Sequence, residues 1–283
     1  MPEVKWLVER EVFEEENRLL EAIRHSGNKC FETSYIPFNA GMIECPYSNE
    51  DCVVSYGSIN LIRKLYRTQE WIPNAWFNLE NLACTTYYTH WSQYLFQDDY
   101  FFMTWGELKN RKTWIERCFN SEPVFIKPNE NLKVFTGKVV EWETFDHFYK
   151  QEDECYTPTY DSLVIVSRAK NIDREWRLVI IDGKVITGSL YKEDRKTKLD
   201  VNVPKEVINY AEVIAGDKWT PDSVYVMDIC QRKENLNLLE IGAFNCAGLY
   251  ASDLNLLVEC INKKAQEDYT EIYTKYGAKL NGL

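Results

Sequence analysis

Short apolar runs alternate along the chain with segments whose apolar residues recur at helical spacing, a pattern typical of mixed α and β structure. The apolar runs predict buried strands at residues 52–56, 124–128, 162–167, 175–181, 184–190, 224–229 and 236–241. The helical spacing predicts helices at residues 9–24, 61–66, 104–119, 144–150, 203–215 and 252–266. Asp182-Gly183 joins two of the strands and is the strongest hairpin signal in the chain. We therefore expect an α+β protein.

Two of these predicted strands each carry an acid where a buried strand would normally have an apolar residue. Asp228 lies in the first, Glu240 lies in the second, a polar turn at residues 231–235 joins them, and Asn245 follows. A buried carboxylate is costly unless it is paired or binds a metal. A hairpin would bring both acids and the amide oxygen together as hard ligands of the kind that Mg²⁺ accepts. The sequence therefore predicts a Mg²⁺ site at Asp228, Glu240 and Asn245.

Composition narrows the classes of partner and compartment. The 283 residues, 45% of them apolar, are enough for a substantial core in two or three lobes. A net charge of −11 provides no global field for nucleic acid, so no nucleic-acid partner is expected and a phosphate site must be local. No apolar run is long enough to span a bilayer, and the charged N-terminus lacks a signal-peptide pattern, so no membrane partner is expected.

Nine cysteines without a Cys-x-x-Cys pair indicate free thiols and a reducing cytoplasm. A zinc site built from His25 with Cys30, Cys45 or Cys52 is the alternative for part of this set.

The aromatic residues crowd into the first half of the chain, above all between residues 71 and 102. With little positive charge among them, they indicate a core or a binding wall rather than a nucleic-acid stacking platform. The composition changes near Ser121. We expect an aromatic-rich N-terminal region at residues 1–120 and a second domain at residues 121–283, with a subdomain boundary near residues 162–170.

Two lysines lie where a local phosphate site could form. Lys127 ends a predicted strand, and Lys133 lies in a loop that leads to Thr136-Gly137. A strand-end lysine either extends along the sheet edge into solvent or reaches a phosphate. A second lysine and the backbone amides near a glycine favour the phosphate interpretation. The spacing fits neither a Walker A loop nor a Gly-x-Gly-x-x-Gly motif, which argues against the P-loop and Rossmann classes.

Arg177 is the third candidate cation. In a strand, Glu175 and Arg177 share one face and Trp176 takes the other. The pair is either a cross-strand ion pair of little consequence or an arginine held by its neighbour and aimed at a transferring phosphoryl group. Tyr191 and Lys192, at the end of the hairpin, either face an acceptor or simply end a strand.

These features follow one another in a characteristic order: a strand lysine, a second lysine in a Thr-Gly loop, an apolar strand, Glu-Trp-Arg before a hairpin, and Asp228 ahead of Leu-Leu-Glu…Phe-Asn-Cys-Ala-Gly-Leu-Tyr. The ordered set resembles the ATP-grasp superfamily, most closely the clade named for one arginine and two lysines. The resemblance runs from residue 123 to about residue 257, and residues 52–59 are similar to the clade's pre-ATP-grasp region. It implies two α+β subdomains that clasp a nucleotide, preceded by an α/β lobe.

The resemblance also implies roles for the cations. Lys127 would hold the α- and β-phosphates of ATP, and Lys133 would close over the phosphates with the backbone around Thr136 and Gly137. Arg177, beside Glu175, would stabilise the γ-phosphate during transfer.

For the base and the metal, the resemblance implies contacts from two further segments. Residues 164–167 would offer main-chain groups to the adenine edge and apolar side chains to its faces; the residues concerned are Val164, Val166 and Ser167. Asp228, Glu240 and Asn245 would bind Mg²⁺. Many ATP-grasp proteins have Glu-x-Asn, but here Gly242 stands two residues after Glu240, so either Asn245 or water takes that position.

The function implied by this resemblance is that of an ATP-dependent carboxylate–amine ligase. Such an enzyme forms an amide bond through an acylphosphate, here on a peptide, a protein, an amino acid or another small carboxylate and amine. No histidine or cysteine lies in a recognisable nucleophile–base arrangement, and this chemistry needs none. The alternative is a non-catalytic ATP-binding module that uses nucleotide to hold a partner-recognition shape. A bacterial or bacteriophage origin is expected from the distribution of the clade.

Overall fold

The computed structural model describes residues 1–36, 43, 45–130, 132, 134–155 and 158–276. The chain forms two compact units. Unit 1 comprises Met1–Asn78, Arg174–Ile229 and Glu240–Leu283, and unit 2 comprises Leu79–Asp173 and Cys230–Leu239. The boundary predicted near Ser121 falls inside unit 2, and the division of the chain at that residue stays a prediction.

The first sheet of unit 1 is parallel, with the strand order β2-β1-β3-β4. Its strands are β1 (Val4–Glu9), β2 (Lys29–Thr33), β3 (Cys52–Tyr56) and β4 (Ile72–Asn74). The predicted helix at residues 9–24 is wrong at its start, because α1 covers only Glu16–His25. Residue 9 is the last residue of β1, and residues 10–15 form turns before α1 begins. Trp6, Leu7 and Val8 of β1 are fully buried, because both faces of a central parallel strand are covered.

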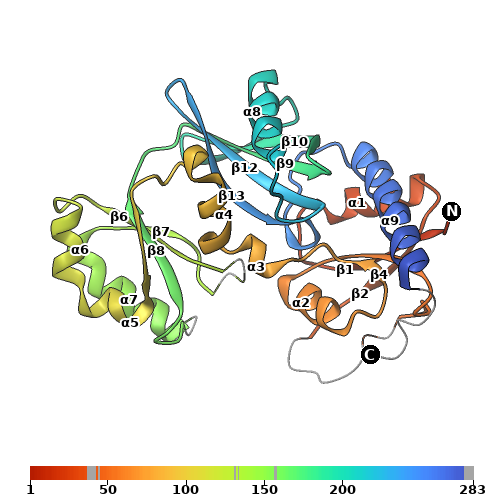
Figure 1. The fold of residues 1–283 in the computed structure, drawn as a ribbon, viewed down its shortest axis with the longest axis horizontal. Helices are drawn as coiled ribbons and strands as arrows, with labels where there is room; N and C mark the ends of the chain where they lie inside the picture. The colour runs from red at the N-terminus through yellow and green to blue at the C-terminus, as the bar shows by residue number, and fades with distance from the viewer. Residues whose placement is uncertain (37–42, 44, 131, 133, 156–157, 277–283) are drawn as a thin grey trace. The chain divides into compact units, whose positions relative to one another are not determined.

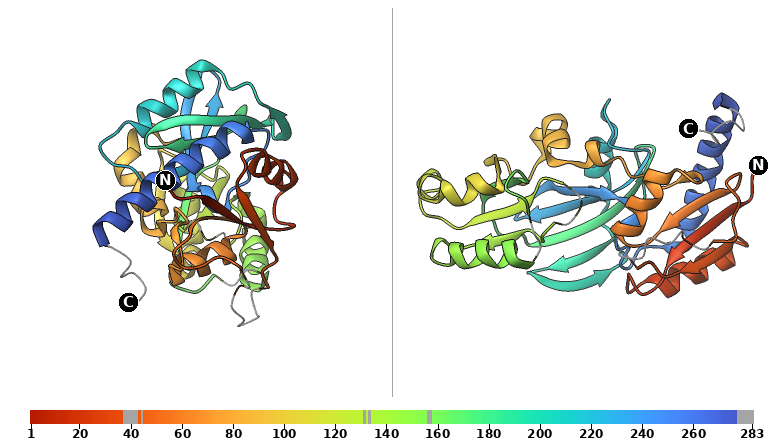
Figure 2. Two further views of the ribbon diagram at one scale, coloured as in Figure 1. Left: turned by 90° about the vertical axis from the view of Figure 1, so that its right-hand side faces the viewer. Right: turned by 90° about the horizontal axis from the view of Figure 1, so that it is seen from below.

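Helices cover both faces of this sheet. Leu7 and Val53 pack with Leu61 and Leu65 of α2 (Ile59–Thr68), which begins at the N-cap Ser58. On the other face, α1 lies beside the C-terminal helix α9 (Leu254–Tyr276) (Figure 2). None of the described helices, α9 included, is both long enough and apolar enough to cross a membrane.

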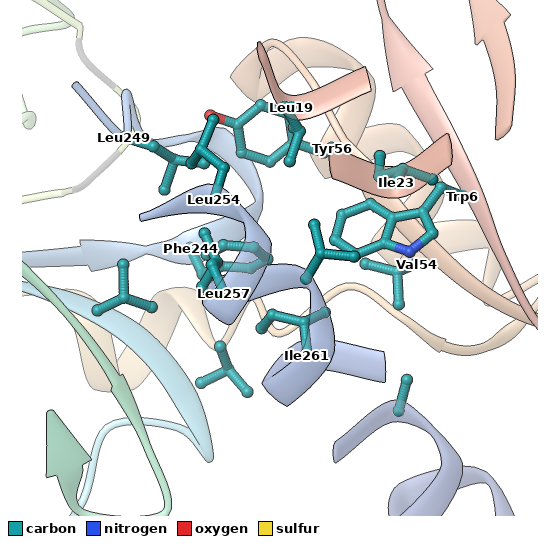
Figure 3. Packing of buried hydrophobic residues seen from close by; sticks show 14 of the residues in the cluster. Trp6, Leu19, Ile23, Val54, Tyr56, Phe244, Leu249, Leu254, Leu257 and Ile261 are labelled. Carbon is teal, nitrogen blue, oxygen red and sulfur yellow. The ribbon is translucent and has the colours of Figure 1, made fainter. Parts of the chain in front are cut away.

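One hydrophobic cluster joins this sheet to the second sheet of unit 1. Trp6, Ile23, Val54, Phe244 and Leu257 pack together from five different elements (Figure 3). Val179 and Ile181 of the second sheet belong to the same cluster. The two sheets of unit 1 therefore share a core.

The second sheet has the strand order β11-β10-β9-β12-β13. Its strands are β9 (Arg174–Ile181), β10 (Lys184–Glu193), β11 (Lys196–Asp200), β12 (Val224–Arg232) and β13 (Asn235–Ala243). The hairpin predicted at Asp182-Gly183 is confirmed: both residues have positive φ, 46° and 78°, as a type I′ turn requires. Helix α8 (Lys205–Ala215) packs on β9 and β10.

Unit 2 contains an antiparallel sheet with the order β5-β8-β6-β7 and helices beside it (Figure 1). The strands are β5 (Tyr100–Thr104), β6 (Val124–Pro128), β7 (Lys138–Val140) and β8 (Leu163–Arg168). The remaining elements are α3 (Leu79–Leu82), α4 (Cys84–Trp91), α5 (Trp105–Asn110), α6 (Lys112–Cys118), α7 (Phe145–Cys155) and short 3-10 turns. The single helix predicted at residues 104–119 is therefore divided at Arg111, and Thr104 caps its first part, α5, in a capping box with Glu107.

Candidate functional site

An arginine and an aspartate from neighbouring strands form the centre of the site in unit 1. Arg177 of β9 donates to Asp228 of β12 through Nε to Oδ1 and Nη2 to Oδ2, both at 2.8 Å. Asp228 is 1% exposed, so this two-point contact is buried. Glu240 of β13 lies 3.9 Å from the same Nη2 and is 49% exposed. The predicted Mg²⁺ acids therefore lie together, and Arg177 lies beside both of them.

Glu175 belongs to the same cluster, as the period of two predicted. Its Oε2 accepts a hydrogen bond of 2.6 Å from the Tyr191 hydroxyl, which also lies 3.3 Å from Oδ2 of Asp228. Lys192 pairs with Oε1 of Glu175 at 3.1 Å. Tyr191 and Lys192 therefore do more than end a strand: both contact the acid cluster.

A β-bulge explains how two consecutive residues of β10 reach the same acid. Leu190 pairs with Trp176 and Lys192 pairs with Glu175, so Tyr191 is the extra residue of the bulge. Extra residues in bulges commonly redirect side chains near functional sites. No sequence signal for this bulge was recognised.

Tyr250 is a member of the site that the sequence reasoning missed. Its ring stacks on Tyr191 with centroids 4.8 Å apart and an interplanar angle of 8°. The guanidinium of Arg177 lies 5.2 Å from the Tyr250 ring centroid and 5.7 Å from that of Tyr191, and it also donates to the Gly248 carbonyl at 3.2 Å. Tyr250 has a φ of 50°, which is uncommon for a bulky residue and is found at functional sites. This backbone conformation is not visible in the sequence.

Burial and charge act together on the titratable groups of the cluster. In the contacts given for the described part of the chain, the carboxylates of Glu175, Asp228 and Glu240 lie near the cations Arg177 and Lys192. Burial raises the pKa of Asp228, Arg177 lowers it, and the neighbouring acids raise it further, with a net rise. Burial also opposes the charge on Arg177, but Asp228 outweighs this effect and raises the pKa of the guanidinium above its usual range. Burial and the nearby acids raise the pKa of Tyr191, so its phenol keeps its proton.

The donor set fits Mg²⁺ that arrives with a nucleotide. Among the residues that the structure describes, no group of three or more His, Cys, Asp or Glu side chains could hold a metal ion by itself. Mg²⁺ in nucleotide sites needs only one or two protein carboxylates, because phosphates and water provide the other ligands. Asp228 and Glu240 offer such a pair of hard oxygen donors, and the latter is open to solvent.

Asn245 has a different environment from these acids. It is fully buried, and its Oδ1 accepts from the Trp76 main-chain N–H at 2.9 Å while its Nδ2 donates to the Ser55 carbonyl at 2.6 Å. Its own carbonyl accepts from the Gly57 N–H at 2.9 Å. These contacts tie β3 to the segment after β13. The predicted metal role of Asn245 stays a prediction that the described contacts do not support.

In unit 2, Lys127 lies at the end of β6, as predicted, and is only 8% exposed. Its Nζ donates to the Tyr87 hydroxyl at 3.3 Å and lies 5.7 Å from the ring centroid of Tyr88. Tyr88 in turn contacts Tyr100 and Phe102 of β5, with ring centroids 4.9 and 5.9 Å apart. Part of the predicted aromatic region is therefore a wall beside the predicted phosphate lysine.

The strand register shows which residues of β8 lie opposite Lys127. In the strand register Lys127 pairs with Ile165, and Phe125 pairs with Ser167. The alternate residues Val164 and Val166 pack into the core formed with the helices of unit 2. Because side chains alternate across a strand, Ile165 and Ser167 share one face of β8 and Val164 and Val166 share the other; the predicted contacts of Val164, Val166 and Ser167 with a base stay a prediction. Ser167 is fully buried, and its hydroxyl has no hydrogen-bond partner among the described residues.

The predicted lid loop is described in part. Lys133 lies outside the described residues. Thr136 is exposed, and Gly137 lies so close to β6 that an added Cβ would be 2.6 Å from the Phe125 ring and 3.1 Å from Cβ of Lys127. A larger residue at position 137 would therefore require the Phe125 ring to shift.

A groove of about 550 Å³ in unit 1 contains none of the predicted residues. It lies between α1 and the start of α9, and Arg18, His25, Ser252 and Asp253 are among its lining residues. Arg18 donates to the carbonyls of Tyr250 at 2.8 Å and Ser252 at 3.0 Å. The segment that carries Tyr250 therefore connects the acid cluster to this groove.

The fold is that of ATP-grasp proteins. It is similar to a D-alanine–D-alanine ligase from Bacillus anthracis (TM-score 0.60, 13% identity, 98% of this chain and 100% of that chain covered). It is also similar to the D-cycloserine synthetase DcsG (TM-score 0.60, 13% identity, 93% of this chain and 99% of that chain covered). A third similar structure is the ATP-grasp ligase PsnB with a precursor peptide and AMPPNP (TM-score 0.55, 12% identity, 93% of this chain and 97% of that chain covered). No curated protein sequence matches the chain.

The family follows from the sequence match. The profile for the ATP-grasp domain of the clade named for one arginine and two lysines, family 2, matches residues 107–260. This is more than half of the chain, and the protein belongs to this family. The resemblance to the clade is thereby confirmed. The match includes Lys127, Arg177, Asp228 and Glu240.

Proposed function

We propose that the protein is an ATP-dependent carboxylate–amine ligase that works through an acylphosphate on a peptide, protein or amino-acid substrate. The observation that carries the proposal is the cluster of three carboxylates around Arg177, one of them half exposed. Such a cluster suits Mg²⁺ and transferring phosphate. The names of similar structures, a D-alanine–D-alanine ligase and a ligase bound to a precursor peptide, support this class of substrate.

In the proposed reaction, a substrate carboxylate oxygen attacks the γ-phosphorus of ATP and ADP leaves. An amine then attacks the acyl carbon, inorganic phosphate leaves, and the nitrogen loses a proton. The bond changes involve only substrates, so the protein contributes positioning and charge. A hydrolytic side reaction would compete with the amine, so water must be kept from the acylphosphate.

The residues take the following proposed roles. Lys127, Lys133 and the backbone at Thr136-Gly137 would hold the phosphates, and Arg177 would stabilise the transferring group. Mg²⁺ bound by Asp228 and Glu240 would neutralise phosphate charge. The mixed charges of the groove between α1 and α9 suit a substrate with an ammonium and a carboxylate.

A second candidate is an ATP-binding module without ligase turnover, whose nucleotide-bound shape a partner protein recognises. The observation in its favour is that Asp228 and the Gly248 carbonyl already engage Nε and both terminal nitrogens of Arg177. In either case, the free state of the described cysteine thiols supports a proposed cytoplasmic location.

The first test is thermal unfolding with and without Mg²⁺ and a non-hydrolysable ATP analogue. A ligand at one hundred times its Kd stabilises the folded state by about 2.7 kcal/mol, which raises the midpoint measurably. Wild type should show this rise, Lys127→Ala and Asp228→Asn should lose it, and the exposed-lysine control Lys184→Ala should keep it. No rise in wild type contradicts nucleotide binding.

The second test separates the two candidates. Wild type with Mg²⁺·ATP and pools of carboxylates and amines should release ADP and phosphate in equal amounts and form an amide detectable by mass spectrometry. Binding without release of ADP would instead favour the module.

A further inference from the structure

The hydroxyl of Tyr191 lies between two acids from different strands. It is 2.6 Å from Oε2 of Glu175 on β9 and 3.3 Å from Oδ2 of Asp228 on β12. The phenol has one proton to donate, and the hydrogen bond to Glu175 is the stronger one because it is shorter than the contact with Asp228. The hydroxyl therefore fixes the spacing between the two carboxylates while its main hydrogen bond goes to Glu175.

The contacts of Asp228 show what this spacing achieves. Its Oδ2 lies next to both Nη2 of Arg177 and the Tyr191 hydroxyl, whereas Oδ1 accepts one hydrogen bond among the described residues, from Nε of Arg177. A carboxylate oxygen has about two lone-pair sites. The crowded side of Asp228 is thus turned toward Tyr191, and Oδ1 keeps capacity for a cation.

The ring of Tyr191 is fixed as well as its hydroxyl. It stacks on Tyr250 at 4.8 Å, and the guanidinium of Arg177 lies against both rings. The side chain is therefore held from its face and from its tip. Because the Tyr191 side chain has little freedom to move, its hydroxyl restricts the orientation of the Asp228 carboxylate.

We propose that Tyr191 is a positioning residue for the divalent cation of the nucleotide: its hydroxyl, which contacts Oδ2 of Asp228, holds this carboxylate in the orientation that leaves Oδ1 with capacity for the cation. The inference rests on the proposed function, because it assumes that Mg²⁺ with ATP is bound at these acids. It adds a residue on β10 to a site built from β9, β12 and β13. The role depends on the hydroxyl, whereas the stack with Tyr250 depends on the ring.

The experiment compares Tyr191→Phe, which keeps the ring and removes the hydroxyl, with Tyr269→Phe. The Tyr269 hydroxyl donates at 2.7 Å to the Glu50 carbonyl, so the control loses one phenolic hydrogen bond in the same unit outside the cluster. Mn²⁺ is titrated into each protein with saturating non-hydrolysable ATP analogue, and bound ion is measured by electron paramagnetic resonance. Urea unfolding without ligand measures the stability of each variant.

Tyr191→Phe should raise the Mn²⁺ concentration for half-saturation about tenfold, as expected when a hydrogen bond to a charged group is lost. Tyr269→Phe should leave it unchanged. An unchanged half-saturation in Tyr191→Phe, with a normal wild-type response, would overturn the role of Tyr191 and leave the proposed function standing. No Mn²⁺ binding in wild type would overturn both.

If Tyr191 has a purely structural role, a different result is expected. In that case Tyr191→Phe would shift the urea midpoint while Mn²⁺ binding to the folded protein stayed at the wild-type value. This result would also overturn the proposal.

Discussion

Arg177 and Asp228 meet through two parallel hydrogen bonds of 2.8 Å, on neighbouring strands of one sheet. The planar guanidinium matches the carboxylate as a fork, which a lysine could not do. Glu240, 3.9 Å from Nη2 of Arg177, is half exposed, whereas the pair itself is largely buried. This relationship ties the stability of the sheet to the chemistry proposed for it.

Loss of the arginine alone should be costly. Arg177→Met leaves Asp228 buried without its partner, and we expect the free energy of unfolding to fall by about 3–5 kcal/mol. The double variant Arg177→Met with Asp228→Leu should lose less, because no buried charge is left unpaired. Urea unfolding of both single variants, the double variant and wild type measures the coupling.

The matched control for this cycle is Arg24→Met. Arg24 is 59% exposed and pairs with Glu32 at 2.6 Å, so its removal should cost about 1 kcal/mol or less. If Arg177→Met costs no more than Arg24→Met, the buried pair does not have the importance assigned to it.

In unit 2, Tyr87→Phe should weaken nucleotide binding. The variant removes the hydroxyl that holds Nζ of Lys127 at 3.3 Å and keeps the ring in place. We expect an affinity loss of about tenfold for a non-hydrolysable ATP analogue, measured by calorimetry, because a hydrogen bond to a charged group is lost. Tyr160→Phe, at an exposed position of the same unit, should bind as wild type does. Equal affinity in both variants would argue against a positioning role for Tyr87.

Asn245→Ala separates a structural role from a metal role. The variant leaves the Trp76 N–H and the Ser55 carbonyl without their partner, both in buried surroundings. We expect the free energy of unfolding to fall by about 3 kcal/mol. The Mg²⁺-dependent rise in melting midpoint with the ATP analogue should persist. A variant of normal stability that has lost this rise would restore Asn245 to the metal site.

The contribution of Asp222 to stability should decrease as the pH rises from about 4 to about 6. Burial raises its pKa from 3.8 to about 6, although the Ser223 and Asn78 N–H groups lower it; Asp268 and Lys264 act on it more weakly. The folded state therefore binds more protons in this window, so the stabilisation present below the unfolded pKa is lost as pH rises through the folded pKa. We expect a loss of about 2 kcal/mol, somewhat below the full value of the shift because Asp222 is partly exposed.

The measurement is urea unfolding at several pH values between roughly 3.5 and 7, the range that covers both pKa values. Asp222→Asn should flatten this part of the profile. Wild type and Asp222→Asn profiles that run parallel through this window would contradict the expected effect of Asp222.

Much of the fold could be predicted because its signals are local. The strand at Cys52–Tyr56 and the strand at Val124–Pro128 follow from uninterrupted apolar runs, and their bounds match the prediction. The Asp182-Gly183 turn follows from residues that tolerate positive φ. By contrast, β1 at Val4–Glu9 was not predicted, and its assignment as a strand follows from its pairing with β2 and β3 and from its burial.

The start of the last helix also could not be predicted to the residue from the sequence. The last helix was predicted to begin at Ser252, but α9 begins at Leu254, and Oδ1 of Asp253 accepts from the N–H groups of Asn255 and Leu256, each at 3.1 Å. Both residues suit an N-cap. The choice between them depends on Thr187, whose hydroxyl accepts from the Asp253 N–H and fixes where the helix begins.

By itself, the sequence determined the class of protein and the main charged residues. A buried acid in each of two strands, an arginine and a strand lysine in a fixed order indicate ATP-grasp chemistry, because charge in apolar strands is expensive and needs a purpose. Only the tertiary structure decided how these residues are paired. Strand pairing brings Asp228 to Arg177, a bulge turns Tyr191 toward Glu175, and the same register places Ile165 instead of Val164 beside Lys127. The physical reason is that contacts between distant segments depend on register and backbone conformation, which local side-chain patterns do not specify.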